Sequence, residues 1–332
     1  CTMTAVGIII GTAASLCLLL CALPACSTGK TGCCSLSLGR YVKLAVPVML
    51  GSALTSLLSS ANDALVPLTL RQAGNSTSEA FSLFGIFEAI ILPTLFFPST
   101  ILCSLAGILV TETAREKAAG GYVRITTLTE KVVRQTIVFS VFVTAILLLF
   151  GHEIGELLGG GEIAGRMIVL LAPVVPFIYM EIVLESIIKG IGEQTFSSIN
   201  YLCEYIIRIS FVLIFIPLLG FYGIVLSYYA SNVCGNISRL ILVIRKTGMQ
   251  PNFVGLVGIP IFSAVFAVQI GRLGFAVLHA APGGSIASML LFCLLGGCMY
   301  LVLQRELFRL YGAIPKDAPL LPFKNRAHEP HS

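Results

Sequence analysis

Long apolar runs separated by short polar segments follow one another along most of the chain. A helix needs about 20 apolar residues to cross a hydrocarbon core about 30 Å thick. Alternation with period two is absent, and backbone polar groups in lipid must be satisfied within their own segment, so each run is predicted to be a helix. The predicted spans are residues 4–24, 44–70, 80–111, 135–151, 164–188, 196–218, 221–244, 254–278 and 285–304. The pattern predicts an all-α fold, a polytopic transmembrane helical bundle of about nine helices.

The composition agrees with a membrane protein. The 332 residues are 56% hydrophobic and 11% charged, with a mean hydropathy of +0.95, whereas soluble domains have about 25% charged residues. A cytosolic enzyme, a secreted module and a disordered chain are thereby excluded. No segment between the spans is long enough for a soluble catalytic or nucleotide-binding domain. We therefore expect no enzymatic activity, no catalytic residue, no cofactor, no metal and no nucleic acid partner.

The basic residues gather in alternate loops, which predicts the topology. Lysine and arginine are retained on the cytoplasmic side of a membrane, and 17 of the 21 basic residues are assigned to one side. We therefore expect a multi-pass protein of the cell (cytoplasmic) membrane with a cytoplasmic C-terminus. The residues assigned to this side are Lys30, Arg40, Lys43, Arg115, Lys117, Arg124, Lys131, Arg134, Lys189, Arg239, Arg245, Lys246, Arg305, Arg309, Lys316, Lys324 and Arg326.

Two carboxylates, Asp63 and Glu88, fall at similar depth in the outer half of consecutive spans. Ionisable groups at membrane depth are costly, and by default they face a bundle interior or a wet cavity. Arg71 is the nearest basic residue along the chain. We expect Asp63 and Glu88 to share a cavity wall and to accept a proton, a cation or a cationic substrate. A hydrogen bond to a neighbouring serine is the alternative.

A second group, Glu181, Glu204 and Arg208, belongs to the hairpin of the fifth and sixth spans. Glu181 and Glu204 are almost equally far from the turn, so they should meet at one depth. Arg208, one turn beyond Glu204, is predicted to bridge the two carboxylates. The sequence leaves open whether this buried charge cluster is structural or couples transport to an ion.

Several segments resemble the stage V sporulation protein B group. These proteins are polysaccharide flippases of the multidrug/oligosaccharidyl-lipid/polysaccharide exporter superfamily. The resemblance covers roughly residues 40–250. It is carried by NDALVPL at 62–68, QAG at 72–74, SEA at 78–80, LFG at 83–85, Pro93, Pro98 and the turn IIKGIGEQ at 187–194.

The resemblance implies that the chain is a fragment of a fourteen-helix, two-lobe transporter fold and contains helices six to fourteen. Residues 1–43 would hold the last helix of the N-terminal lobe and a cytoplasmic loop, and residues 44–250 the six-helix C-terminal lobe. Residues 251–305 would form two accessory helices and residues 306–332 a cytoplasmic tail. It also implies that Asp63, Glu88 and Arg71 line the substrate and ion pathway. Thr69 occupies the position of the family's arginine.

The expected function is the transport of a lipid-linked oligosaccharide or polysaccharide precursor across the cytoplasmic membrane by alternating access. Such a flippase would act in cell-envelope or spore-cortex biosynthesis. Its expected partners are the lipid-linked saccharide, membrane lipids and a coupling cation or proton. Three alternatives stay open: a cation-coupled multidrug exporter, a membrane enzyme such as a polyprenyl-linked glycan ligase, and a non-transporting scaffold. An excess of acidic over basic residues facing the cavity would favour the multidrug exporter.

Overall fold

The computed structural model describes residues 11, 38–250, 254–278 and 296–307. This part of the chain is all helical, with no strand. It contains four continuous helical runs that are long and apolar enough to cross a membrane, Thr77–Ala118, Tyr122–Leu157, Gly161–Gly190 and Gln194–Thr247. The all-α fold is thus confirmed for these residues, and the four runs are consistent with a membrane protein. The count of nine spans is not confirmed. Predicted spans 44–70 and 254–278 are not among these four runs, and spans 196–218 and 221–244 fall in one run. Most of spans 4–24 and 285–304 lies outside the described residues.

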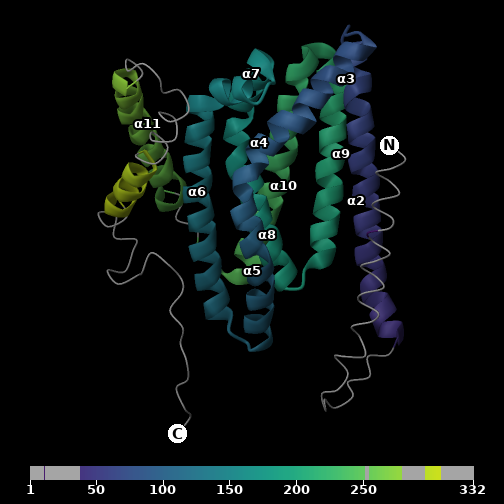
Figure 1. Ribbon diagram of the computed structural model, residues 1–332. Coiled ribbons are helices and arrows are strands. Elements are labelled where there is room, and N and C mark those ends of the chain that lie inside the picture. The colour runs from purple at the N-terminus through teal and green to yellow at the C-terminus, as the bar shows by residue number, and fades with distance from the viewer. Residues whose placement is uncertain (1–10, 12–37, 251–253, 279–295, 308–332) are drawn as a thin grey trace. The chain divides into compact units, whose positions relative to one another are not determined.

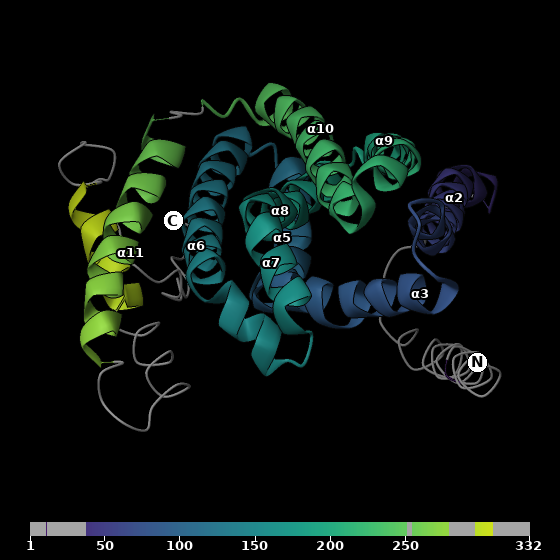
Figure 2. The ribbon, with the colours of Figure 1, turned by 90° about the horizontal axis from the view of Figure 1, so that it is seen from above.

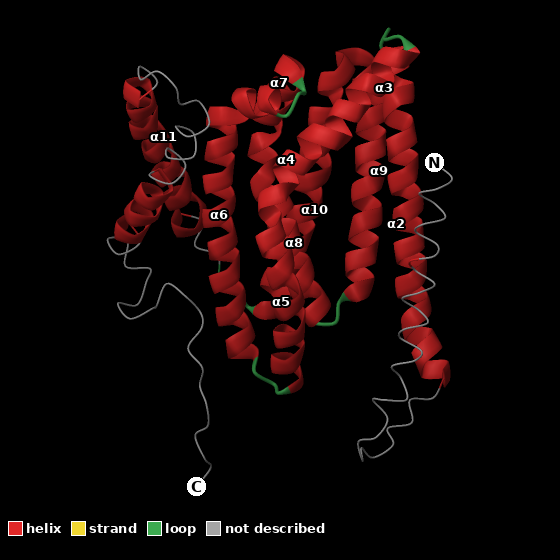
Figure 3. Cartoon of the chain, in the orientation of Figure 1, coloured by secondary structure: helices red, strands yellow, loops and turns green. Residues whose placement is uncertain are grey.

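The backbone contacts divide the chain into two compact units, Cys1–Val46 and Pro47–Ser332. In the second unit the helices between residues 47 and 247 follow one another through short turns (Figures 1 and 3). The boundary predicted at residue 250 is not tested by this division. The elements are α2 (Leu38–Gln72), α3 (Thr77–Ile86), η1 (Phe87–Ile91), α4 (Leu92–Phe96), η2 (Phe97–Ser99), α5 (Thr100–Ala118), α6 (Tyr122–Leu157), α7 (Gly161–Leu171), η3 (Ala172–Val174), α8 (Val175–Gly190), α9 (Gln194–Leu219), η4 (Gly220–Tyr222), α10 (Gly223–Thr247), η5 (Val254–Gly258) and α11 (Ile259–Leu278).

Prolines divide two of the long runs into shorter helices. The run Thr77–Ala118 changes to a π-helix just before Pro93 and to a 3₁₀ turn at Pro98. Pro173 lies in the 3₁₀ turn between α7 and α8, and Pro176 is in the first turn of α8. Proline lacks the N–H that would continue the helical ladder, and its ring clashes with the preceding turn. The breaks in these two runs thus coincide with prolines.

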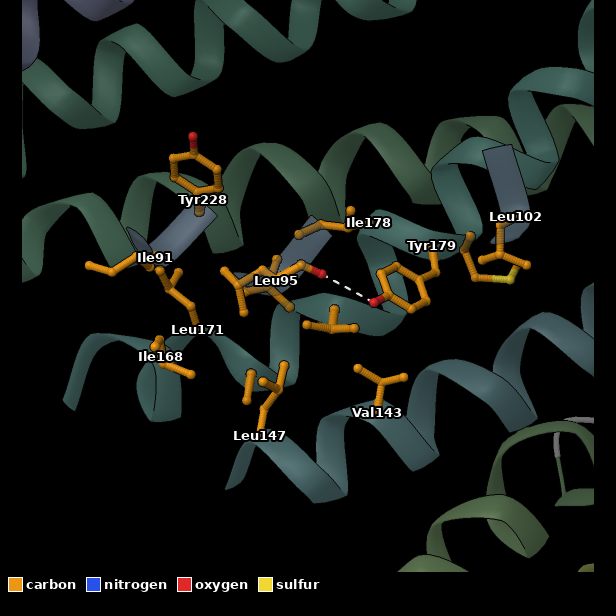
Figure 4. Packing of buried hydrophobic residues seen from close by; sticks show 14 of the residues in the cluster. Ile91, Leu95, Leu102, Val143, Leu147, Ile168, Leu171, Ile178, Tyr179 and Tyr228 are labelled. Atoms are coloured by element: carbon orange, nitrogen blue, oxygen red, sulfur yellow. Dashed lines mark hydrogen bonds between the residues drawn. The ribbon is translucent and has the colours of Figure 1, made fainter. Parts of the chain in front are cut away.

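Helix α8 lies in the centre of the bundle, in contact with α5, α6, α9 and α10 (Figure 2). Its apolar side chains pack into one continuous core with those of the helices around it. Figure 4 shows Tyr179 of α8 within this core; its hydroxyl donates a hydrogen bond to the carbonyl oxygen of Leu95, 3.1 Å away. The buried hydroxyl of Tyr179 thus has a hydrogen-bond partner in the core, the carbonyl oxygen of Leu95 near the helix break at Pro98.

The described helices are apolar on the outside and polar on parts of the inside. Large apolar side chains such as Phe97 and Leu218 are exposed, as lipid-facing residues are. Helix α10 buries a row of polar residues at helical spacing, Ser227, Ser231, Asn232, Asn236 and Arg239. In a water-soluble helix the polar face is exposed, whereas here it is buried. The polar face of α10 lies toward α8 and α9.

The basic turns meet at one end of the bundle. The α5–α6 and α8–α9 turns lie at the same end in Figure 3. Lys117 Nζ donates to the carbonyl oxygen of Ile191, and Lys246 Nζ pairs with Glu193. These contacts join the ends of α5 and α10 to the α8–α9 turn, as the predicted grouping of the loops requires. The side of the membrane on which this end lies stays a prediction.

Arg239 is a correction to that grouping. It was counted among the basic residues of the cytoplasmic side, although it falls within the predicted span 221–244. The structure places it inside α10, two turns before the helix ends, with a side chain that is 0% exposed. Three carboxylates and an aromatic ring surround it and replace the water that a loop would provide.

Candidate functional site

Both groups of carboxylates predicted at membrane depth face one cavity of ≈ 340 Å³. Helices α2, α8, α9 and α10 contribute to it, together with η1 and α4. We call it the carboxylate cavity. Its lining residues are Ser59, Asn62, Asp63, Glu88, Leu92, Phe96, Ile178, Glu181, Ile182, Tyr201, Glu204, Tyr205, Arg208, Tyr228 and Asn232.

Asp63 and Glu88 share this cavity, as their similar depth predicted. Both side chains are exposed to it, and neither forms an ion pair with a cation of the described residues. Asp63 Oδ1 accepts a hydrogen bond of 3.3 Å from Asn62 Nδ2. Glu88 lies in the π-helix that precedes Pro93, a local widening that often occurs at functional positions. These two carboxylates are free to take a cation or a proton.

Glu181 of α8 and Glu204 of α9 meet, as their distances from the turn predicted, but through Arg239 of α10. The Nη2 atom of Arg239 lies 2.9 Å from Glu204 Oε2 and 3.2 Å from Glu181 Oε1. Its Nε atom lies 3.5 Å from Glu185 Oε2. We call these four residues the charge cluster. Glu181 and Glu204 reach the carboxylate cavity, while Arg239 lies behind them and is not among the lining residues.

Arg208 does not bridge the two carboxylates, so that prediction was wrong. Its Nη2 atom lies 3.7 Å from Glu204 Oε1, and the structure records no contact with Glu181. The Nε atom instead donates to Ser231 Oγ at 3.0 Å. The guanidinium lies over the ring of Tyr228, 4.5 Å from its centroid, and 5.2 Å from that of Tyr205. Arg239 takes the bridging position because it reaches the carboxylates from the opposite helix.

The sequence held a signal for Arg239 in the buried polar row of α10. Asn232, Gly235 and Asn236 precede it on the same face. Gly235 provides the room, since a Cβ there would lie 2.6 Å from Glu204 Oε2 and 3.0 Å from Arg239 Nη1. A loop residue would need neither the polar row nor this glycine.

Aromatic side chains also line the carboxylate cavity. Phe96, Tyr201, Tyr205 and Tyr228 face the same cavity as the carboxylates. Three of the rings already have a guanidinium group over them. Arg239 lies 4.6 Å from the centroid of Tyr201, and Arg208 lies over Tyr205 and Tyr228. Ring faces attract cations through their quadrupole. These rings were not among the site residues predicted from the sequence.

Arg71, the third residue assigned to the pathway, lies elsewhere. It lines a separate pocket with Leu68, Gln72 and residues 75–77, at the turn between α2 and α3. Because α2 continues to Gln72, Arg71 is two turns beyond Asp63. The structure thus separates Arg71 from Asp63 and Glu88.

The carboxylate cavity is acidic. Four carboxylates line it, from Asp63, Glu88, Glu181 and Glu204, against the single guanidinium of Arg208. Such a cavity attracts cations and repels anions. In the part of the chain that the structure describes, no group of three histidine, cysteine, aspartate or glutamate side chains is placed to hold a metal ion. Comparisons with protein-family models, curated proteins and solved structures find no match to the chain.

Proposed function

We propose that the protein is a cation-binding membrane transporter of the multi-pass exporter type. The observation that carries the proposal is the carboxylate cavity, with four carboxylates and one guanidinium inside a bundle of helices that can cross a membrane. Ionisable groups at this depth mark ion and substrate pathways. Broken helices beside such groups are typical of transporters, and the breaks at Pro93 and Pro98 adjoin Glu88.

The proposed substrate class is an organic cation. Carboxylates and aromatic rings face the same space, and this combination recognises alkylammonium and arylphosphonium groups. The acidic excess favours the cation-coupled exporter over the lipid-linked saccharide flippase, because a diphosphate would meet more carboxylates than guanidinium groups. Asp63 and Glu88, which have no cationic partner among the described residues, are proposed to bind the cation or a coupling proton.

A lipid-linked saccharide flippase is the second candidate, supported by a different feature. An apolar pocket of ≈ 670 Å³ lies between α6, α8, α10 and the η5–α11 segment. Its lining includes Val141, Met180, Leu240 and Val265. A prenyl chain would fit this apolar chemistry. Under this reading the protein would act in cell-envelope assembly, with its C-terminus in the cytoplasm.

The two candidates are separated by the sign of the charge that the cavity accepts. Tetraphenylphosphonium and tetraphenylborate have the same shape and opposite charges, and each can be titrated against the purified full chain in detergent, with empty micelles as the blank. We expect saturable binding of tetraphenylphosphonium alone. The variant Glu162→Gln is the control for charge in general. It removes a carboxylate outside the carboxylate cavity, since Glu162 pairs with Arg166 on the exposed face of α7. Binding of farnesyl diphosphate without tetraphenylphosphonium would favour the flippase and contradict the proposal.

A further inference from the structure

Arg208 is the one cation of the described chain that lines the carboxylate cavity. Its side chain is 14% exposed and projects from α9 toward α10. There it contacts the carboxylate of Glu204 and the rings of Tyr205 and Tyr228. A carboxylate with two ring faces is the chemistry of a subsite for an organic cation. The guanidinium of Arg208 therefore occupies the position that such a ligand would take.

The attachment of Arg208 is weak in comparison with that of Arg239. Arg239 is 0% exposed and its Nη2 atom contacts two carboxylates, at 2.9 and 3.2 Å. Arg208 lies 3.7 Å from Glu204, beyond hydrogen-bond distance, and its one hydrogen bond within the described structure goes to Ser231. A guanidinium has five N–H donors and is weakly hydrated, so it exchanges readily between an ion pair and a ring face. Arg239 thus has more and closer carboxylate contacts than Arg208.

We propose that Arg208 is a tethered cation that fills the subsite of Glu204, Tyr205 and Tyr228 when the cavity holds no ligand. A ligand cation enters this subsite by displacing the guanidinium. This inference rests on the proposed cation-binding function and adds a specificity-determining residue to it. Weakly interacting cations fail to displace Arg208, so the cavity selects those that combine a positive charge with aromatic surface.

The acidic lining can hold the ligand cation and the displaced guanidinium of Arg208 at the same time. After displacement, the guanidinium remains in a cavity that also contains Asp63, Glu88 and Glu181. Glu204 keeps its contact with Arg239 at 2.9 Å, so the wall of the subsite does not depend on Arg208. Removing the guanidinium should therefore open the subsite without dismantling it.

The test is the affinity of the full chain for tetraphenylphosphonium. Arg208→Gln should bind it about tenfold more tightly than the wild type, since the competing cation is gone and the cavity becomes more acidic; a tenfold change corresponds to about 1.4 kcal/mol. Ser231→Ala removes the hydroxyl that accepts from Arg208 Nε and that also donates to the carbonyl oxygen of Tyr228 within α10. It should tighten binding about two- to threefold. Arg166→Gln, at an arginine paired with Glu162 on the exposed face of α7, should leave the affinity unchanged.

The outcomes separate this inference from the proposed function. If wild type, Arg208→Gln and Ser231→Ala all fail to bind tetraphenylphosphonium, the proposed function fails. If the wild type binds and Arg208→Gln binds equally or more weakly, the tethered cation alone is refuted. If Arg208→Gln does not fold, as judged by its thermal midpoint, Ser231→Ala decides: tighter binding supports the inference, and unchanged or weaker binding overturns it.

Discussion

Arg239 and Glu204 form a buried ion pair between α10 and α9, with Nη2 of the arginine 2.9 Å from Oε2 of the glutamate. Their side chains are 0% and 4% exposed. Glu181 of α8 accepts from the same Nη2 atom, so one guanidinium joins three helices. The charge cluster thereby holds two of the four carboxylates at the wall of the carboxylate cavity.

Removing the arginine should destabilise the protein. Arg239→Met leaves Glu181, Glu185 and Glu204 without their central cation, and breaking a buried pair in this way costs about 3–5 kcal/mol. We expect a clearly lower thermal midpoint in detergent. Arg208→Gln should lower the midpoint much less, because its contact with Glu204 is longer, at 3.7 Å.

A second substitution tests the electrostatic cause. Glu204→Gln in the Arg239→Met background removes one uncompensated negative charge and should recover part of the lost stability. The two changes would then be strongly non-additive, as expected for residues in contact. Additive effects, or an Arg239→Met protein as stable as the wild type, would show that the charge cluster does not hold the three helices together.

The unpaired carboxylates should affect binding and leave stability unchanged. In Asp63→Asn/Glu88→Gln two negative charges leave the carboxylate cavity, and we expect tetraphenylphosphonium affinity to fall about tenfold or more, since each lost ionic hydrogen bond or contact is worth about 1.5–3 kcal/mol. The thermal midpoint should not fall, because neither residue has a cationic partner among the described residues and their mutual repulsion disappears. Full affinity in this variant would exclude both residues from the site.

Close packing of α6 on α7 depends on a glycine. A Cβ at Gly155 would lie 2.3 Å from the backbone nitrogen of Gly165 and 2.6 Å from its Cα. Gly155→Ala should therefore push the helices apart and destabilise the protein by about 1–3 kcal/mol. Gly107→Ala in α5 is the matched control, since a Cβ there meets nothing within 4 Å. We expect it to be neutral or to stabilise α5 by up to about 1 kcal/mol, and equal effects would refute the packing argument.

The hydrogen bond from Tyr179 to Leu95 gives a further test of the core. Tyr179→Phe keeps the ring and leaves the buried carbonyl oxygen without its donor, which should cost about 1–3 kcal/mol. Tyr122→Phe serves as the control, because Tyr122 is 62% exposed. A thermal midpoint for Tyr179→Phe equal to that of Tyr122→Phe would show that water or another donor replaces the hydroxyl.

The sequence predicted the helices well, because hydrophobic runs and prolines act locally. Span 164–188 falls within the run Gly161–Gly190, and Pro173 marks the break between its two helices. The depth of each carboxylate in the bundle was also predictable, since it follows from the number of residues between it and the end of its helix. Asp63 and Glu88 therefore share a cavity as expected, and Glu181 meets Glu204.

The choice of partners was not predictable in the same way. Which arginine reaches Glu181 and Glu204 depends on the rotation of α10 against α8 and α9, which residue counts do not determine. Arg239 was counted with the basic residues of the cytoplasmic side, yet the local polarity of α10 indicated a buried face. The aromatic lining was missed for the same reason, since tyrosines on α9 and α10 converge only after the helices pack.

The most direct test of the central claim, that the cavity carboxylates hold a cation, is chemical protection mapped by mass spectrometry. A water-soluble carbodiimide modifies accessible carboxyl groups, and the reaction can be run on the full chain with and without saturating tetraphenylphosphonium. We expect the cation to protect Asp63 and Glu88, while the exposed Glu112 and Glu162 react equally in both samples. Unchanged modification of Asp63 and Glu88 in the presence of bound tetraphenylphosphonium would contradict the claim.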